Sequence, residues 1–222
     1  MSGQPAPQRV LRVDLVSDVV CPWCYIGWRA FQLAAAGLPE IPVRVAFRPF
    51  QLDPEVPPEG VDRHARLLAK FGGDAQRLAA SGAAVAEAGR DVGIRFDFAR
   101  IDRMPNTLDA HRLLRWASGA GLGAAMAETL FRAYFCEGED LTSRATLTGL
   151  ARGIGMDGAV VRDLLATDAD RDAVMADINH ARTMGVTGVP CFIFDSSLAV
   201  IGAQSVDKFT RAIETAWQAA NA

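Results

Sequence analysis

Cysteine is scarce in this sequence, and long hydrophobic runs are missing altogether. The 222 residues include four cysteines, which is too few for a disulfide-stabilised scaffold. No apolar stretch reaches the roughly 20 residues that a membrane-spanning helix needs. The first ten residues, MSGQPAPQRV, have neither the basic nor the apolar region of a secretory signal. We therefore expect a cytoplasmic protein, in which any disulfide would be transient and catalytic.

An excess of charge of either sign is also lacking. Lysine and arginine total 23 against 26 acidic residues, which gives a formal net charge of −3. Nucleic acids and anionic membranes attract strongly basic surfaces, so neither is expected as a partner. The arginines are scattered among acids, a pattern typical of solvated helix faces. Half of the residues are hydrophobic, enough for one large domain or one domain with a big insertion.

The N-terminal part of the chain carries the pattern of a strand, a helix and a second strand. VLRVDLV, which ends at Val16, alternates apolar and polar residues, and so does VRVAF at 43–47. The helix between them is expected to have Pro22 at its first position and Gly37 as its stop. This order predicts a right-handed crossover and a parallel pair of strands.

The C-terminal part returns to a strand pattern. GVPCFIFD and LAVIG are short apolar runs separated only by SS. They are too close for a crossover connection, so they predict an antiparallel hairpin. The segment SVDKFTRAIETAWQAA then predicts a helix with Ser205 as its cap.

Residues 61–184, between these two parts, are almost continuously helical in pattern. The expected helices are 61–71, 75–92, 107–118, 124–136, 144–154, 159–165 and 170–184. IRFDF, at 94–98, has an extended pattern and is a candidate for a short strand.

Cys21 and Cys24 flank the dipeptide Pro-Trp, and this spacing allows three interpretations. A zinc site needs four ligands, usually with a second close pair. The two other cysteines lie far apart and the three histidines form no ligand-like pair, which argues against zinc. Inert core thiols are allowed because free cysteine is often buried. The third interpretation, a redox pair, is the one that the local pattern favours.

The physical reason for favouring a redox pair is the expected position of Cys21 and Cys24 at the start of a helix. The unpaired N–H groups and the positive end of the helix dipole both favour a thiolate there. A second thiol one turn further along is near enough to close a short disulfide, and Pro22 stiffens the turn between them. We expect Cys21 to have an exposed sulfur and Cys24 to be shielded. A C-x-x-C beside a strand–helix–strand pattern is typical of thioredoxin-like proteins.

The segment GVTGVP, at 185–190, stands where a thioredoxin fold places its cis-proline loop, immediately before the hairpin. With a helical insertion between the two strand-bearing parts, the chain from about Val10 to Ala219 resembles the DsbA family. SDVVCPWCYIGW, PNTLDAHRLL, FRAYFCEGEDL, GVTGVPCFIFD and VIGAQ resemble its FrnE-like branch. A trans proline at a strand start remains the plainer alternative for Pro190.

The resemblance implies an α/β fold, the DsbA-like thioredoxin fold (βαβ…ββα) with a large inserted helical domain. It divides the chain into a discontinuous thioredoxin-like domain, 10–58 and 186–220, and an inserted helical domain, 59–185. It also implies protein dithiol–disulfide oxidoreductase activity, with an extended substrate segment paired to the backbone of Val189 beside a cis Pro190. The Pro-Trp dipeptide, where the periplasmic enzyme has Pro-His, and the missing export signal both argue against a strong oxidant.

Several other residues have both a structural and a functional interpretation. Cys191 is expected to be a buried core thiol, and Cys136 is expected to be structural, with a disulfide between the two as the lesser alternative. His111 is expected to be partly buried and satisfied rather than a catalytic base. Asn106 and Thr107 are expected to cap a helix, and in the family this helix start lies near the active-site face.

The sequence is therefore interpreted as that of a thiol–disulfide oxidoreductase in which Cys21 attacks and Cys24 resolves the mixed disulfide. The expected partners are protein or peptide thiols and disulfides, with glutathione as a further candidate, and the chain is a monomer or a homodimer. No metal, nucleotide or flavin is expected, because the dithiol is the redox group and no Gly-rich phosphate loop is visible. The expected tuning and binding residues are Pro22 and Trp23 for redox poise, and Val189, Pro190 and Asn106 for substrate.

Two other functions stay open at this point. A kappa-class glutathione transferase or 2-hydroxychromene-2-carboxylate isomerase would share the fold, but such enzymes generally keep a single Ser or Cys where this chain has C-x-x-C. Cys24 is thus the discriminating residue, and it favours the oxidoreductase. A non-catalytic peptide-binding or holdase module is the third alternative.

Overall fold

The fold is built on a four-stranded sheet with the strand order β2-β1-β5-β6. The computed structural model describes residues 9–219, and all structural statements concern that range. The strands are β1 (Leu11–Ser17), β2 (Val43–Pro49), β5 (Cys191–Phe194) and β6 (Leu198–Ile201). β1 is parallel to β2, and β5 is antiparallel to both β1 and β6. The predicted parallel pair and the predicted hairpin are confirmed.

The pairing of β1 with β5 brings the N-terminal and C-terminal strand-bearing parts of the chain together. Leu15 lies opposite Phe192 and Val16 lies opposite Cys191. Two segments that the sequence analysis singled out therefore meet: the C-x-x-C follows the end of β1, and Pro190 immediately precedes β5.

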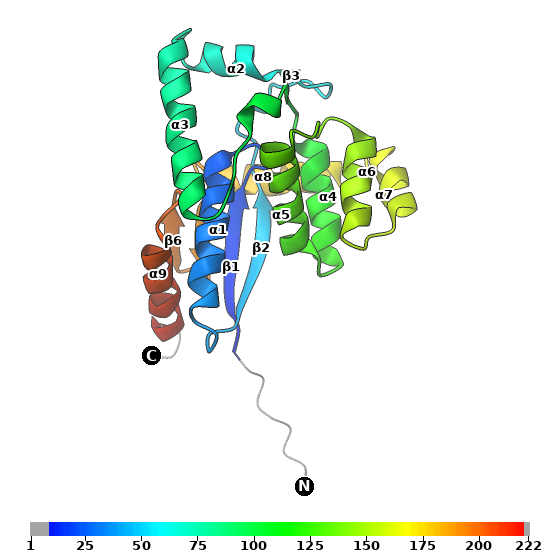
Figure 1. Ribbon diagram of the computed structural model, residues 1–222. Coiled ribbons are helices and arrows are strands. Elements are labelled where there is room, and N and C mark those ends of the chain that lie inside the picture. The colour runs from blue at the N-terminus through cyan, green and yellow to red at the C-terminus, as the bar shows by residue number, and fades with distance from the viewer. Residues whose placement is uncertain (1–8, 220–222) are drawn as a thin grey trace.

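One face of the sheet is covered by α1 (Pro22–Ala36) and α9 (Val206–Ala219) (Figure 1). The alternation in β1 explains this, since Leu11, Val13 and Leu15 are almost fully buried in the same core as residues of both helices. The side-chain oxygen of Ser205 accepts the N–H of Lys208, so the predicted cap of the last helix is confirmed.

The segment between the two strand-bearing parts is largely helical, as predicted. Its helices are α2 (Arg63–Lys70), α3 (Ala75–Asp91), α4 (Leu108–Gly119), α5 (Gly123–Arg132), α6 (Arg144–Gly153), α7 (Gly158–Leu165) and α8 (Arg171–Thr183). Helices α4, α5 and α8 contact β2, while α2 and α3 extend past the end of the sheet where α1 begins (Figure 1). The division into two domains stays a prediction, and its last residue, 220, lies outside the described residues.

Two local expectations were wrong. Residues 61–62 form a short strand, β3 (Val61–Asp62), paired with β4 (Arg103–Met104), so the helix starts only at Arg63. IRFDF is not a strand, because Phe96 and Phe98 stack on each other at 5.0 Å and both contact Phe135 edge-on. The helix expected over 124–136 is confirmed: it comprises α5 and a π-helical turn, Ala133–Glu137.

None of the helices within the described range is long and apolar enough to cross a membrane.

Candidate active site

Cys21 and Cys24 lie at the start of α1, just beyond the end of β1. Cys21 precedes the first helical residue with an extended backbone (φ −94°, ψ 110°), and Pro22 opens the helix. Proline is suited to this position because its missing N–H would have had no partner there. The Cys21 carbonyl accepts the N–H of Cys24 at 3.0 Å. The predicted position of the pair at a helix N-terminus is confirmed.

The two thiols differ less in exposure than predicted. Cys24 is fully buried, which agrees with the expected shielding, but Cys21 is only 4% exposed, so the prediction of an exposed sulfur was wrong. The cause is the loop before β5, because the Cys21 thiol donates to the carbonyl oxygen of Val189 across 3.7 Å. The Cys21 thiol and the Val189 backbone therefore lie side by side.

This loop contains the cis peptide bond that the resemblance implied, between Val189 and Pro190. Its proline packs closely against α1 at Gly27, where a Cβ atom would lie only 3.1 Å from Pro190 Cγ. The Pro190 carbonyl accepts the N–H of Gly202 at 2.8 Å. The loop is thus held between the helix that carries the cysteines and the end of β6.

Burial dominates the electrostatics of the Cys24 thiol. It raises the pKa of Cys24 well above its ordinary value, and the hydrogen bond and charge of Cys21 raise the pKa further. A backbone N–H of Asp18 acts in the opposite direction, while the Asp18 carboxylate adds to the rise. Cys24 is therefore a protonated thiol near neutral pH, and its proton must leave before it can attack.

A mostly apolar groove of about 400 Å³ opens beside Pro22. Its walls are formed by Val20 and Pro22 together with Arg63, His64, Leu67, Phe71, Ala75, Leu78, Ala79, Ser81, Gly82, Val85, Phe98, Ala99, Met104 and Tyr134. Most of these residues come from α2 and α3. Trp23, on the exposed side of the turn, is 41% exposed, as predicted. The cysteine pair thus has an apolar wall on one side and an exposed indole within its own turn.

The helix α2 is held over this groove mainly by charge, since none of its residues is buried. The carboxylate of Asp53 accepts two hydrogen bonds from Arg66, both at 2.8 Å, and lies 2.9 Å from the ammonium of Lys70. The Arg66 hydrogen bond is the main reason why the pKa of Asp53 falls to about 2. The groove wall is therefore fastened to the segment that follows β2.

The side chain of Asn106 makes its hydrogen bonds to other residues of the protein. Its Oδ1 accepts the N–H of Leu108 at 3.0 Å and the side chain of Gln51 at 3.1 Å, and its amide donates to the carbonyl of Val56 at 2.6 Å. The capping role of Asn106 is confirmed. That of Thr107 was wrong, because its side chain makes no capping hydrogen bond; Asn106 supplies the acceptor instead.

Asp18 and His111 form a buried pair that the sequence analysis did not identify. They are 1% and 2% exposed, and His111 Nε2 lies 3.4 Å from Asp18 Oδ1. His111 was expected to be partly buried and satisfied, yet its Nδ1 has no hydrogen-bond partner among residues 9–219. The one available signal was the position of an acid three residues before Cys21.

All four cysteines are free in the structure. Cys191 is 4% exposed, as expected of a core thiol, and burial raises its pKa. Cys136 is half-buried, and burial followed by the charge of Glu137 raises its pKa. No cluster of three or more potential ligand side chains among residues 9–219 is arranged to hold a metal ion.

The family comparison agrees with this geometry. The model of the DSBA-like thioredoxin domain matches residues 12–214. The chain belongs to that family. A relative from Bacillus subtilis, the uncharacterized protein YwbO, is 27% identical over 204 residues, which cover 91% of this chain and 96% of YwbO.

Three solved structures extend the comparison. The probable DsbA oxidoreductase SCO1869 from Streptomyces coelicolor is 34% identical, with a TM-score of 0.86 over 94% of this chain and 90% of that one. A 2-hydroxychromene-2-carboxylate isomerase (16% identity, TM-score 0.69, 94% and 96% covered) has a similar fold. So does the cytosolic disulfide reductase DsbM from Pseudomonas aeruginosa with GSH (19% identity, TM-score 0.65, 93% and 99% covered).

Proposed function

We propose that this DSBA-like protein is a thiol–disulfide oxidoreductase that exchanges disulfides with protein, peptide or small-thiol substrates through Cys21 and Cys24. The observation that carries the proposal is the contact of the Cys21 thiol with the Val189 carbonyl, 3.7 Å away, at the cis-proline loop. It places a thiol at a helix N-terminus beside backbone groups on which an extended substrate segment would lie.

In the reductive direction, the Cys21 thiolate attacks one sulfur of a substrate disulfide and the other sulfur leaves as a thiolate. Cys24 then loses its proton and attacks the Cys21 sulfur. The Cys21–Cys24 disulfide forms, and the substrate leaves as its second thiolate. Oxidation of a substrate dithiol runs through the same steps in reverse. No other redox group takes part in this scheme.

The other site residues have supporting roles in the proposal. Pro22 and Trp23 set the redox poise, and Val189 with Pro190 aligns the substrate. Asn106, which the sequence analysis assigned to substrate binding, would act indirectly by holding Gln51 and Val56 in place, since all its polar side-chain atoms have partners in the protein. Glutathione is included among the substrates because DsbM, a protein of similar fold, is known in a structure with GSH. The cytoplasmic location is part of the same proposal and is tested by cell fractionation.

The isomerase or kappa-class transferase is the second candidate function. It is supported by the similar fold of the isomerase and by the apolar groove with Arg63 and His64 in its lining, which suits an aromatic acid or a glutathione conjugate. The buried thiol of Cys24 favours the oxidoreductase, because isomerisation has no use for a resolving thiol.

Equilibration with glutathione redox buffers tests the proposed function. We expect Cys21 and Cys24 to become oxidised together in one reversible two-electron transition, read by thiol trapping and mass spectrometry. A reduction potential of about −120 mV would indicate an oxidant, and one of about −270 mV would indicate a reductant. If the two thiols never form a shared disulfide, or if the protein instead isomerises a chromene carboxylate, the proposal is wrong.

Trp23→His is expected to make the pair more oxidising. Any group that stabilises the reduced Cys21 thiolate raises the reduction potential of the pair. The indole of Trp23 is uncharged and offers only one hydrogen-bond donor. A histidine at this position can add a charge or a hydrogen bond. We expect an upward shift of about 30 mV or more, equivalent to about 1.4 kcal/mol, in the same glutathione titration. Trp23→Phe, which adds neither charge nor donor, is the matched control. An unchanged or lower potential for Trp23→His would mean that the dipeptide does not set the poise.

A further inference from the structure

Arg63, the first residue of α2, is a half-buried cation without a counter-ion among residues 9–219. Its backbone N–H donates to the Asp102 carbonyl at 2.9 Å, but its guanidinium forms no ion pair within that range. The guanidinium lies over the ring of Phe98, 5.2 Å from the ring centre. The negative face of the ring attracts the cation, but it does not neutralise the charge.

The other arginines that are buried or half-buried in the described part of the chain have polar side-chain partners. Arg9 pairs with Asp195, Arg66 with Asp53 and Arg112 with Asp109, and Arg29 donates to Gln32. Withdrawing a cation from water destabilises the folded state unless the cation is paired. Arg63 departs from this pattern, so its charge needs another explanation.

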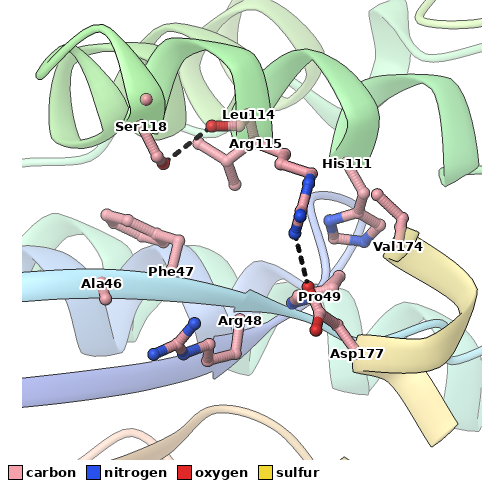
Figure 2. Close-up of a pocket in the computed structure, with 11 residues that line it drawn as sticks. Ala46, Phe47, Arg48, Pro49, His111, Leu114, Arg115, Ser118, Val174 and Asp177 are labelled. Atoms are coloured by element: carbon pink, nitrogen blue, oxygen red, sulfur yellow. Dashed lines mark hydrogen bonds and ion pairs between the residues drawn. The ribbon is translucent and has the colours of Figure 1, made fainter. Parts of the chain in front are cut away.

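A second cavity provides a contrast. It has a volume of about 330 Å³ and lies between β2, α4 and α8 (Figure 2). Its two arginines are both paired: Arg115 lies 2.9 Å from the Asp177 carboxylate, as the dashed line in Figure 2 shows, and Arg48 lies 2.7 Å from Asp14. Their charges are thus compensated within the protein, whereas the charge of Arg63 is available to a ligand.

The groove beside Pro22 joins Arg63 to the cysteine pair. Val20 and Pro22, the two neighbours of Cys21 along the chain, line this groove of about 400 Å³ together with Arg63, Phe98 and Tyr134. A group bound to Arg63 would therefore share the groove with the residues on both sides of Cys21.

The hydroxyl of Tyr134 adds a polar group to the same wall. It donates to the Arg103 carbonyl at 3.2 Å. Burial raises the pKa of Tyr134, and the nearby Arg63 guanidinium opposes that rise. The positive charge of Arg63 thus acts within the groove and not only at the surface.

The carboxylate that holds α2 does not compete for Arg63. Asp53 accepts two hydrogen bonds from Arg66 and lies 2.9 Å from the ammonium of Lys70. Apart from Arg63 and His64, the groove is lined mainly by apolar side chains. Apolar walls with a few polar anchors are typical of ligand-binding sites.

We propose that Arg63 binds a carboxylate of the thiol or disulfide substrate while the substrate sulfur reacts with Cys21. This inference rests on the proposed function and names its preferred substrates, those with a carboxylate close to the reacting sulfur. A guanidinium matches a carboxylate in shape and can donate two parallel hydrogen bonds to it. Acidic side chains of peptides and the free carboxylates of glutathione both supply this group.

The experiment measures the second-order rate at which the reduced protein attacks two matched pairs of disulfides, read by acid quenching and mass spectrometry. One pair is oxidised glutathione and its methyl ester. The other is a peptide disulfide with glutamate beside the cysteine and the same peptide with glutamine. We expect the wild type to attack the acidic member of a pair about tenfold faster, as one hydrogen bond to a charged group would give. The net charge of −3 cannot cause this preference, because it repels the acidic member.

Arg63→Gln is expected to abolish the preference. Loss of a purely structural residue would slow both members of a pair equally, whereas loss of the carboxylate anchor slows only the acidic member. Arg63→Lys should keep part of the preference, because an ammonium retains the charge but not the paired donors. Arg63→Met, which can still pack on Phe98, replaces Arg63→Gln if circular dichroism shows that the glutamine variant is not folded.

Arg77→Gln is the matched control. It removes the same charge from the neighbouring helix α3, at an exposed position outside the groove lining. This variant should keep the full preference. A preference seen only with the peptide pair would assign the carboxylate to protein substrates, and one seen only with the glutathione pair would assign it to the small thiol.

Equal rates for the acidic and neutral members in the wild type would overturn this inference and leave the proposed function standing. So would a preference that survives Arg63→Gln, for example one that disappears only in His64→Gln. A wild-type protein that attacks none of the four disulfides would instead refute the proposed function itself.

Discussion

Replacing Cys24 with alanine is expected to stop turnover after the first step and leave Cys21 covalently joined to its substrate. Well-oriented groups within one molecule act at effective concentrations on the order of 10⁵ M, which no thiol in solution can match. Without Cys24, release of the mixed disulfide depends on such external thiols. We therefore expect multiple turnover with a disulfide peptide and glutathione to fall by several orders of magnitude, as when a nucleophile is removed from other enzymes.

The measurement is turnover together with intact-mass detection of the Cys21 adduct. Alanine is preferred to serine because Cys24 is fully buried and a hydroxyl there would need a hydrogen-bond partner. Cys191→Ala is the control: this thiol is also buried, next to Pro190, but has no part in the proposed exchange. Persistent turnover in Cys24→Ala, or an equal loss in Cys191→Ala, would contradict the two-cysteine scheme.

The elements that the sequence predicted correctly are those whose signals are local. The alternation in β1 and β2, the proline that opens α1 and the short link between β5 and β6 each act within a few residues. The C-x-x-C could be placed for the same reason, because a strand before it and a helix after it are readable from periodicity. The resemblance to a known family then located Pro190 opposite it.

The features that the sequence did not predict depend on partners far along the chain. IRFDF has a strand-like alternation, but Phe96 and Phe98 pack against Phe135 instead of joining a sheet. Cys21 is buried because Val189, which follows the helical segment, covers it. Periodicity carries no information about either contact.

The pairing of Asp18 with His111 was not predicted for a related reason. Each is unremarkable in its own segment, an acid after a strand and a histidine on an amphipathic helix. They meet only when α4 packs against β2, which brings the two side chains within 3.4 Å of each other and removes both from water. The sequence predicts both elements but not their mutual approach.

One arginine is a second example of a feature that the sequence did not predict. The arginines were expected on solvated helix faces, but this one is not. Arg112 of α4 is 2% exposed. Its guanidinium donates to the carbonyls of Leu164, Thr167 and Ala169 at 2.7–2.8 Å and to the Asp109 carboxylate at 2.7 Å. It therefore satisfies the end of α7 and the turn that leads into α8, which sequence periodicity could not show.

Arg112→Met is expected to destabilise the protein strongly for this reason. Methionine retains much of the length and apolar stem of the side chain but leaves the carbonyls of Leu164, Thr167 and Ala169 and the Asp109 carboxylate without their donor. Removing one partner of such a buried charged network costs about 3 to 5 kcal/mol. For a chain of this size that corresponds to a fall in Tm of roughly 10 °C, measurable by differential scanning calorimetry.

Arg115→Met is the matched control on the same helix. Arg115 pairs with Asp170 and Asp177, but its side chain is 44% exposed, and exposed ion pairs contribute only about 0 to 1 kcal/mol. We therefore expect a much smaller shift in Tm for Arg115→Met than for Arg112→Met. Similar losses in both variants would mean that the Arg112 network does not hold α7 and α8 to α4. Because α8 also contacts β2, Arg112→Met should in addition weaken the wall of the cavity that His111 and Val174 line between β2, α4 and α8.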